Sequence, residues 1–443
     1  MSRRRSQTQP GLPAEEDEAR LVHGWRMVER ARELFTEALP PEVLPDSWKD
    51  SRRTFSAVDY LSLLLIGLFN PSVRSLRGLC RASEIDRLQY DWGCGALSLA
   101  STSDAQHLVD PELLRPVIDT LRKEVEKLES RRERIPDTPA ARARMAGFAI
   151  RAVDSTVMEG LPRMIWAVYG GGRPRADGRR STAVRFHLSF DVQHSCPADY
   201  AVTAGGICER QVWEQELQTP PAAAEPAESG GGKPPVRRLD IGDRYYGGNF
   251  ALLERFTRNG THFLTRMRHG EHPDIAEELP VTDEDRAAGV VRQALVYLGK
   301  TPRGSHEERT RVRVIWTEHI VLATDLPPEV LPAALAAHMY RDRWQVEFFF
   351  RWIKCLLGCR HWLAESRRGV TLQLYLVLIM GLLVQWQCGR RPTRRMMELL
   401  HFYFQGILTA EQLSPMLRRA AAEAETAAKS KRLYAKKMAA KKK

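Results

Sequence analysis

The chain has 443 residues, a formal net charge of +12 and a hydrophobic content of 43%. It is longer than one typical compact domain, so we expect two or three structural units with a sizeable core. The positive charge favours a polyanionic partner. Much of this charge is local, because residues 417–443 contain ten Lys or Arg and only two Glu.

Seven cysteines are scattered along the chain, and this odd number argues against a disulfide framework and favours a reducing compartment. The basic N-terminus precedes no apolar segment, so we expect no secretory signal. Two apolar runs, residues 60–69 and 372–386, are shorter than the roughly 20 residues that cross a bilayer. We therefore expect two buried helices and a cytoplasmic protein without membrane contact.

The first third of the chain has the pattern of helices. Residues 1–19 are charged and contain Pro, a composition typical of disorder. From residue 20 to about 140, apolar residues recur at helical spacing between short Pro- or Ser-rich breaks. The sequence therefore predicts an all-helical N-terminal domain over residues 20–140.

The pattern changes near residue 145, where short apolar runs replace the helical spacing. The runs over residues 146–153 and 236–241 each end close to an aspartate, and residues 184–192 alternate as a strand does. The low-complexity segment 219–235 is typical of a flexible surface loop. Several strands that end in acids, followed by helix from residue 331 onward, predict an α/β layer.

The segment 340–354 carries polar residues on one stripe of a predicted helix. At about 100° per residue, one stripe presents an acid between two cations and a phenol: Tyr340, Arg343, Glu347 and Lys354. A separate face is apolar and can pack into a core. Taken alone, the stripe is better explained by an ordinary Arg–Glu pair on a solvated helix.

Two more acids change this interpretation. Asp154 and Asp243 each follow an apolar run, so both carboxylates are expected at the carboxyl edge of a sheet. Together with Glu347 they can converge on hard cations, as phosphodiester cleavage by two Mg²⁺ ions requires. Asp154, which arrives from a strand, is the best candidate for the carboxylate that bridges both ions.

The spacing Y-x2-R-x3-E-x6-K resembles the signature of the "insertion sequence four" family of DDE transposases. Asp154 in AVDSTVMEG resembles the first catalytic acid of that family, and Asp243 in GDRYYGG resembles the second. Tyr245 stands where the family commonly has Gly. This departure leaves Asp240, three residues before Asp243, as an alternative second ligand.

The resemblance implies an RNase H-like catalytic core over residues 145–390, interrupted by a β-rich insertion at about 270–318. A helical region with a basic tail would follow over residues 391–443. Asp154, Asp243 and Glu347 would bind two Mg²⁺ or Mn²⁺ ions. The Tyr, Arg and Lys of the signature would hold phosphates of the DNA end.

The resemblance also implies an activity, a partner and a location. The activity would be metal-dependent hydrolysis of DNA phosphodiester bonds and strand transfer, as in the cut-and-paste transposition of an insertion sequence. The partner would be double-stranded DNA with terminal inverted repeats, bound by a homodimer on paired ends near the bacterial nucleoid, and no small-molecule substrate is expected. The helical domain over residues 20–140 could bind these ends or serve in packing. Two alternatives stay open: a co-opted DNA-binding protein that no longer cuts, and a stand-alone RNase H-like nuclease.

Overall fold

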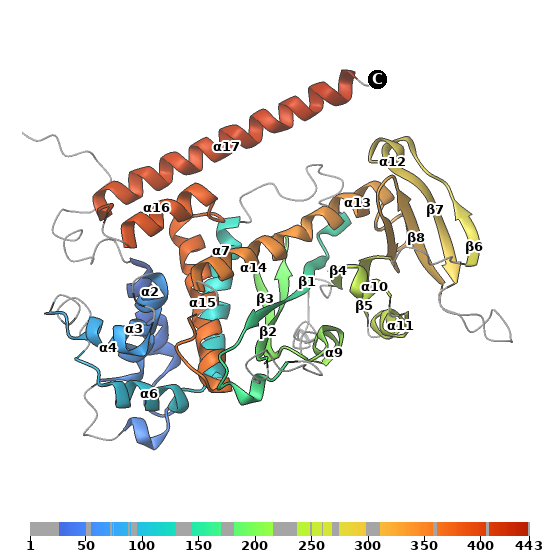
Figure 1. Ribbon diagram of the computed structural model, residues 1–443. Helices are drawn as coiled ribbons and strands as arrows, with labels where there is room; N and C mark the ends of the chain where they lie inside the picture. Colours follow the sequence, from blue (N-terminus) through green and yellow to red (C-terminus); the bar gives the residue numbers. More distant parts are fainter. Residues whose placement is uncertain are drawn as a thin grey trace, which may run out of the picture. The chain divides into compact units, whose positions relative to one another are not determined.

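The computed structural model describes residues 26–49, 55–70, 73, 75–86, 89, 95–129, 144–169, 181–215, 237–248, 250–258, 260–267, 274–297, 311–357, 361–404 and 407–441. The chain divides into two compact units, Met1–Leu121 with Leu356–Lys443, and Arg122–Cys355. It is a mixed α/β protein with a large sheet and many helices, which confirms the predicted class (Figure 1). The predicted N-terminal disorder and the loop 219–235 lie outside the described residues, and the predicted domain boundaries remain predictions.

The first unit is built from helices. They are α2 (Arg26–Ala38), η2 (Asp46–Trp48), α3 (Ala57–Phe69), α4 (Leu76–Ser83), α6 (Leu99–Leu108), η3 (Pro111–Leu114), the start of α7 (Arg115–Glu129), α15 (Arg367–Cys388), α16 (Arg394–Phe404) and α17 (Ala410–Lys441). Helix α3 begins at a capping box in which Ser56 and Asp59 each bond to the other's backbone N–H. Such a box satisfies backbone donors that the first turn leaves open, and therefore fixes where the helix starts.

Helix α15 forms the centre of this unit, against α2, α3, α6 and η3 (Figure 1). It is long and apolar enough to cross a membrane, but 89% of its most apolar 18-residue stretch is buried within the protein. The Tyr375 hydroxyl donates to Glu112 at 2.9 Å and accepts from Arg115 at 3.0 Å. The burial agrees with the predicted core helix, although the helix is longer than the apolar run that suggested it.

The second unit contains the sheet. Its strands are β1 (Phe148–Glu159), β2 (Ala183–Asp191), β3 (Cys196–Ala204), β4 (Arg237–Gly242), β5 (Thr261–Arg266), β6 (Asp274–Leu279), β7 (Val290–Tyr297), β8 (Arg311–Thr317) and β9 (Val321–Thr324). The described strands form one nine-stranded sheet in the order β3-β2-β1-β4-β5-β9-β8-β7-β6. Strands β1, β4 and β5 are parallel, and the other pairings are antiparallel. Its helices are the end of α7, η4 (Ile165–Ala167), α9 (Glu209–Gln215), α10 (Arg244–Gly247), α11 (Phe250–Arg258), α12 (Asp283–Ala287), α13 (Ala333–Asp342) and α14 (Trp344–Leu357).

Strand β1 is longer than its apolar run predicted. Asp154 was expected at the end of the strand, but β1 continues to Glu159 because it stays paired with β2. Its parallel pairing with β4 stops at Ala152, opposite Ile241. Asp154 therefore lies beyond the edge of the parallel pairing but within the strand, and the predicted strand end was wrong.

The alternation of side chains along β1 separates two layers. Val153 belongs to a buried cluster with residues of α9, α10 and α11, among them Trp213 and Phe256. On α14, Phe349 packs on Phe190 of β2 with ring centroids 5.2 Å apart, and Phe350 contacts a second β2 ring, Phe186, at 6.3 Å. Asp154, next to Val153, points toward the junction of α13 and α14, where it meets Arg343.

The predicted helix over residues 340–354 is divided in two at Arg343. Helix α13 ends at Asp342 and α14 begins at Trp344. Around the break, the Arg343 N–H donates to the Tyr340 carbonyl at 3.3 Å and the Val346 N–H donates to the Arg343 carbonyl at 3.1 Å. These i to i+3 bonds tighten the backbone locally as a 3₁₀ turn does. Arg343 keeps helical dihedral angles, so its side chain still lies near both flanking turns.

Candidate active site

The second unit brings Asp154 and Glu347 together on the guanidinium of Arg343. Arg343 Nη2 donates to Glu347 Oε1 at 2.6 Å, and Arg343 Nη1 lies 3.5 Å from Asp154 Oδ2. Only 7% of the Arg343 side chain is exposed, against 20% for Asp154 and 30% for Glu347. Two acids from distant parts of the sequence therefore converge on one partly buried point that solvent can reach.

Asp243 directly follows β4 and caps the short helix α10, where its side chain accepts the Tyr245 N–H at 2.8 Å. Its charge acts on the same site, because it raises the pKa of both Asp154 and Tyr340. The glycine two residues after Tyr245 is sterically required, since a Cβ on Gly247 would overlap the Arg266 carbonyl oxygen. The close approach of α10 to β5 is what holds Asp243 at the sheet edge.

The remaining signature residues occupy two positions. Tyr340 is buried in α13 with its ring 5.8 Å from the Arg343 guanidinium carbon. Lys354 lies in the last turn of α14, seven residues after Glu347 and so about 10 Å further along the helix axis. The structure thus groups Tyr340 and Arg343 with the acids, and places Lys354 two turns beyond Glu347 on α14.

Burial and neighbouring charges determine the protonation of the site. The pKa of Asp154 is raised to about 7: burial is the largest cause and the charges of Glu209 and Asp243 add to it, against the lowering effects of Arg343 and the backbone N–H of Ser155. Burial also raises the pKa of Glu209. Carboxyl groups in this setting hold their charge poorly without a compensating cation.

At Arg343 the neighbouring charges outweigh burial in setting the pKa. Burial alone would lower the pKa of Arg343, but Tyr340, Glu347 and Asp154 raise it above its ordinary value. The guanidinium therefore remains charged and partly compensates the two acids. Burial raises the pKa of the Tyr340 hydroxyl, which stays a neutral hydrogen-bond donor.

Asp240, the alternative second acid, has a different role. It is fully buried, and its carboxylate accepts from Arg238 Nε at 2.8 Å and from Trp213 Nε1 at 2.7 Å. Both oxygens are thus used inside the core. Asp243, which is partly exposed at the sheet edge, is the acid that can reach a ligand.

A fourth acid, which the sequence did not predict, lies beside this site. Glu209, the first residue of α9, accepts hydrogen bonds from the Ser155 hydroxyl and from Arg185 Nη1, the latter at 3.4 Å. Its charge raises the pKa of Asp154, and the charge of Asp243 raises that of Glu209. Its segment, GICERQVWEQ, contains three acidic or basic residues near an apolar pair and gave no spacing that could single it out.

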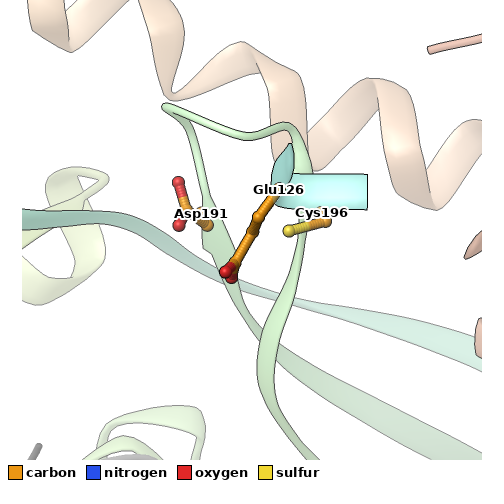
Figure 2. Close-up of side chains that lie close together, drawn as sticks. All are labelled: Glu126, Asp191 and Cys196. Carbon is orange, nitrogen blue, oxygen red and sulfur yellow. The ribbon is translucent and has the colours of Figure 1, made fainter. Parts of the chain in front are cut away.

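A second group of possible metal ligands lies at the turn between β2 and β3, apart from the acids described above. The ligand atoms of Glu126, Asp191 and Cys196 lie within 4.8 Å of one another (Figure 2). Asp191 already accepts the backbone N–H groups of Gln193 and His194, and binds the His194 ring at 2.8 Å. The Asp191 carboxylate therefore has hydrogen-bond partners within the turn, which explains its position without a metal ion.

The histidine of β2 is structural. His187 is buried, and its Nε2 lies 2.8 Å from the Thr203 hydroxyl. Burial, together with the charge of Arg185, lowers the pKa of His187 to about 3. A neutral imidazole with a hydroxyl partner agrees with the structural role that its position in a strand favours.

The chemistry of the site follows from its donors. The three acids offer only carboxylate oxygens, which are the ligands that Mg²⁺ and Mn²⁺ prefer. Asp154 and Asp243 lie at the sheet edge and Glu347 lies on a helix, and both elements are anchored in the core. A divalent cation would offset both the burial and the neighbouring negative charges that raise the pKa of Asp154. The residues therefore fit hard divalent cations and a phosphate-bearing substrate.

Comparison with known proteins gives a family and two relatives. The chain matches the family described as "Transposase DDE domain" over residues 146–383, more than half of its length. It is 25% identical over 241 residues to the Geobacillus stearothermophilus protein named "Probable transposase for insertion sequence element IS5377", covering 54% of this chain and 56% of the relative. It is 38% identical over 257 residues to "Putative transposase y4zB" of Sinorhizobium fredii, covering 57% and 64%. The chain thus spans less than two thirds of the length of either relative.

A solved structure also matches, described as "Cryo-EM structure of piggyBac transposase synaptic complex with hairpin DNA (SNHP)". The match covers 91% of this chain and 83% of that chain at 10% identity. Its TM-score of 0.32 is too low to indicate a common fold.

Proposed function

Because the chain belongs to the transposase DDE domain family, we propose that it is a DNA transposase that hydrolyses phosphodiester bonds and transfers the freed strand. The finer assignment, to the "insertion sequence four" group, rests on Tyr340, Arg343, Glu347 and Lys354. One observation carries the proposal: Asp154 and Glu347 meet on Arg343, which is 189 residues from Asp154 in sequence.

The proposed catalytic core is RNase H-like. Support comes from the order β3-β2-β1-β4-β5, in which an antiparallel hairpin pair adjoins three parallel strands. Strands β6 to β9 follow between Asp243 and Glu347 and extend the same sheet through the pairing of β9 with β5. We propose that they form the β-rich insertion, which the sequence predicts at about 270–318 and which would extend to the end of β9 at Thr324.

The proposed metal ligands are Asp154, Asp243 and Glu347. When bound, two divalent ions would activate the attacking hydroxyl and stabilise the leaving oxygen of a phosphodiester. Asp154 is suited to the central position because it lies between Arg343 on one side and the Ser155 N–H on the other. Asp243 and Glu347 would complete the set from the sheet edge and from α14.

The proposed phosphate contacts come from Tyr340, Arg343 and Lys354. A guanidinium grips phosphate with two hydrogen bonds, an ammonium acts as a point charge, and a phenol donates one bond. Arg343 is paired with the two acids here, so phosphate binding requires it to exchange these carboxylates for phosphate oxygens. Cations at the acids would make this exchange easier, because they would replace the positive charge that Arg343 supplies.

The expected substrate is double-stranded DNA with terminal inverted repeats, cut by a homodimer on paired ends in the bacterial cytoplasm. The test uses a DNA duplex that carries the genomic sequences flanking the coding region. Cleavage and joining should require Mg²⁺ or Mn²⁺, and Glu347→Gln should abolish both while leaving the melting temperature unchanged. As a matched control, Asp283→Asn alters a fully exposed acid on α12 and should retain activity.

Three results would overturn the proposal. Full cleavage by Glu347→Gln would remove the acid from the catalytic set. Cleavage by the wild-type protein without any joining of 3′ ends would instead assign a stand-alone nuclease. Specific binding of the terminal DNA without cleavage in either metal would assign a co-opted DNA-binding protein.

A further inference from the structure

Glu209 occupies a rigid position beside the proposed catalytic acids. It opens α9, and Trp213, four residues later, lies on the same side of that helix. Trp213 is fully buried and donates to Asp240. Its ring centroid lies 4.0 Å from that of Phe256 and 4.7 Å from that of Tyr246. With Trp213 fixed in this way, the start of α9 has little freedom to move.

Glu209, Ser155 and Arg185 form a closed set of hydrogen bonds. Glu209 Oε2 accepts the Ser155 hydroxyl, and Arg185 Nη1 donates to Ser155 Oγ at 3.1 Å and lies 3.4 Å from Glu209 Oε2. Arg185 Nε is held in turn by the Gly205 carbonyl at 3.1 Å. The Arg185 side chain is 20% exposed and that of Glu209 is 14% exposed, so the charge-assisted bonds are largely shielded from water.

Ser155 connects this set to Asp154. The backbone N–H of Ser155 donates to Asp154 Oδ1 at 2.8 Å, while Asp154 Oδ2 faces Arg343. Neighbouring side chains on a strand point to opposite faces, so Ser155 is held from the α9 side while Asp154 is presented on the α14 side. Tethering Ser155 therefore fixes the peptide that orients the Asp154 carboxylate.

We infer that Glu209 and Arg185 are positioning residues for metal binding: by clamping Ser155 they hold Asp154 with Oδ2 turned toward the metal site. The inference rests on the proposed role of Asp154 as a metal ligand. Partners that orient a ligand in this way typically change metal affinity by about 10- to 100-fold when removed. Glu209 reaches this role without touching the metal.

The test measures Mn²⁺ binding to the full chain by electron paramagnetic resonance, from the signal of free Mn²⁺ during titration. We expect Glu209→Ala and Ser155→Ala each to weaken binding by about tenfold or more. The double variant should bind no more weakly than either single variant, because both substitutions break one tether. Ser155→Thr keeps the hydroxyl and should bind as the wild type does, and Glu214→Ala is the control within α9.

Thermal melting of each variant checks the fold, and Glu209→Gln serves if the alanine variant is unstable. Gln keeps an acceptor for Ser155, so it should weaken Mn²⁺ binding less than Ala does. Unchanged binding in Glu209→Ala, additive losses in the double variant, or equal losses for Gln and Ala would each overturn the inference.

One further variant separates this inference from the proposed function. If Asp154→Asn loses Mn²⁺ binding while Glu209→Ala retains it, the positioning role fails and the proposed function stands. If Asp154→Asn binds Mn²⁺ as the wild type does, both fail together.

Discussion

Asp240 and Asp243 are three residues apart, and the structure predicts opposite consequences for neutralising them. Asp240 is fully buried and pairs with Arg238, of which only 4% is exposed. The two Nη atoms of Arg238 are buried without a hydrogen-bond partner, so the charge of this residue depends on Asp240. Asp240→Asn would leave a buried cation without its carboxylate.

Removing one partner of a buried ion pair costs about 3–5 kcal/mol. For a unit of this size, each kcal/mol lowers the melting temperature by about 2–4 °C, so Asp240→Asn should lower it by about 6–20 °C. Asp243 is partly exposed and caps α10, and Asn caps helices as well as Asp does. Asp243→Asn should therefore shift the melting temperature by no more than about 2 °C.

The assay combines thermal denaturation followed by circular dichroism, without metal, with metal-dependent DNA cleavage. Asp243→Asn should melt as the wild type does and fail to cleave. Asp240→Asn should melt early, and any protein that remains folded at low temperature should still cleave. A stable Asp240→Asn variant without cleavage, beside an active Asp243→Asn variant, would refute this assignment of the two acids.

Three further predictions concern stability. The folded pKa of Asp154, about 7, lies above its ordinary value of 3.8, so the folded state binds the extra proton and loses stability as pH rises between these values. Without metal, Asp154→Asn should thus be a few kcal/mol more stable than the wild type at pH 8 but not at pH 4, as urea denaturation can measure. The pKa of His187 is lowered to about 3, so protonation of this residue favours the unfolded state. As pH falls from 6.5, His187 should reduce the free energy of unfolding by about 1.4 kcal/mol per pH unit, and His187→Gln should lack this slope. Phe349→Ala removes the contact of α14 with Phe190 and should cost about 3–5 kcal/mol in the same assay; a loss below about 1 kcal/mol would contradict this packing.

The sequence was sufficient where local pattern determines structure. The alternation over residues 184–192 predicted β2, and the apolar run over 236–241 predicted β4 with Asp243 immediately after it. The run over residues 372–386 predicted the buried helix α15. In each segment the pattern of apolar residues, alternating in β2 and continuous in β4 and α15, reflects which side chains face the core.

The sequence was insufficient where distant residues determine the outcome. The continuation of β1 past Asp154 depends on pairing with β2, and the sequence of β1 itself does not predict this pairing. Asp240 lies within the run over residues 236–241 and Asp243 follows it, and the contacts of Asp240 with Trp213 from α9 and with Arg238 separate their roles. Glu209 approaches the acids through the packing of α9, so its part in the site was visible only in three dimensions.

We propose that Asp154, Asp243 and Glu347 bind the catalytic metal ions directly. Replacing Asp154 by Cys gives the most direct test, because a thiolate is a poor ligand for Mg²⁺ and a better one for Mn²⁺. We expect Asp154→Cys to be inactive in DNA cleavage with Mg²⁺ and to regain activity with Mn²⁺, while Asp154→Asn stays inactive with both. Cleavage by Asp154→Cys in Mg²⁺ at the wild-type rate would show that Asp154 does not bind the catalytic metal ions.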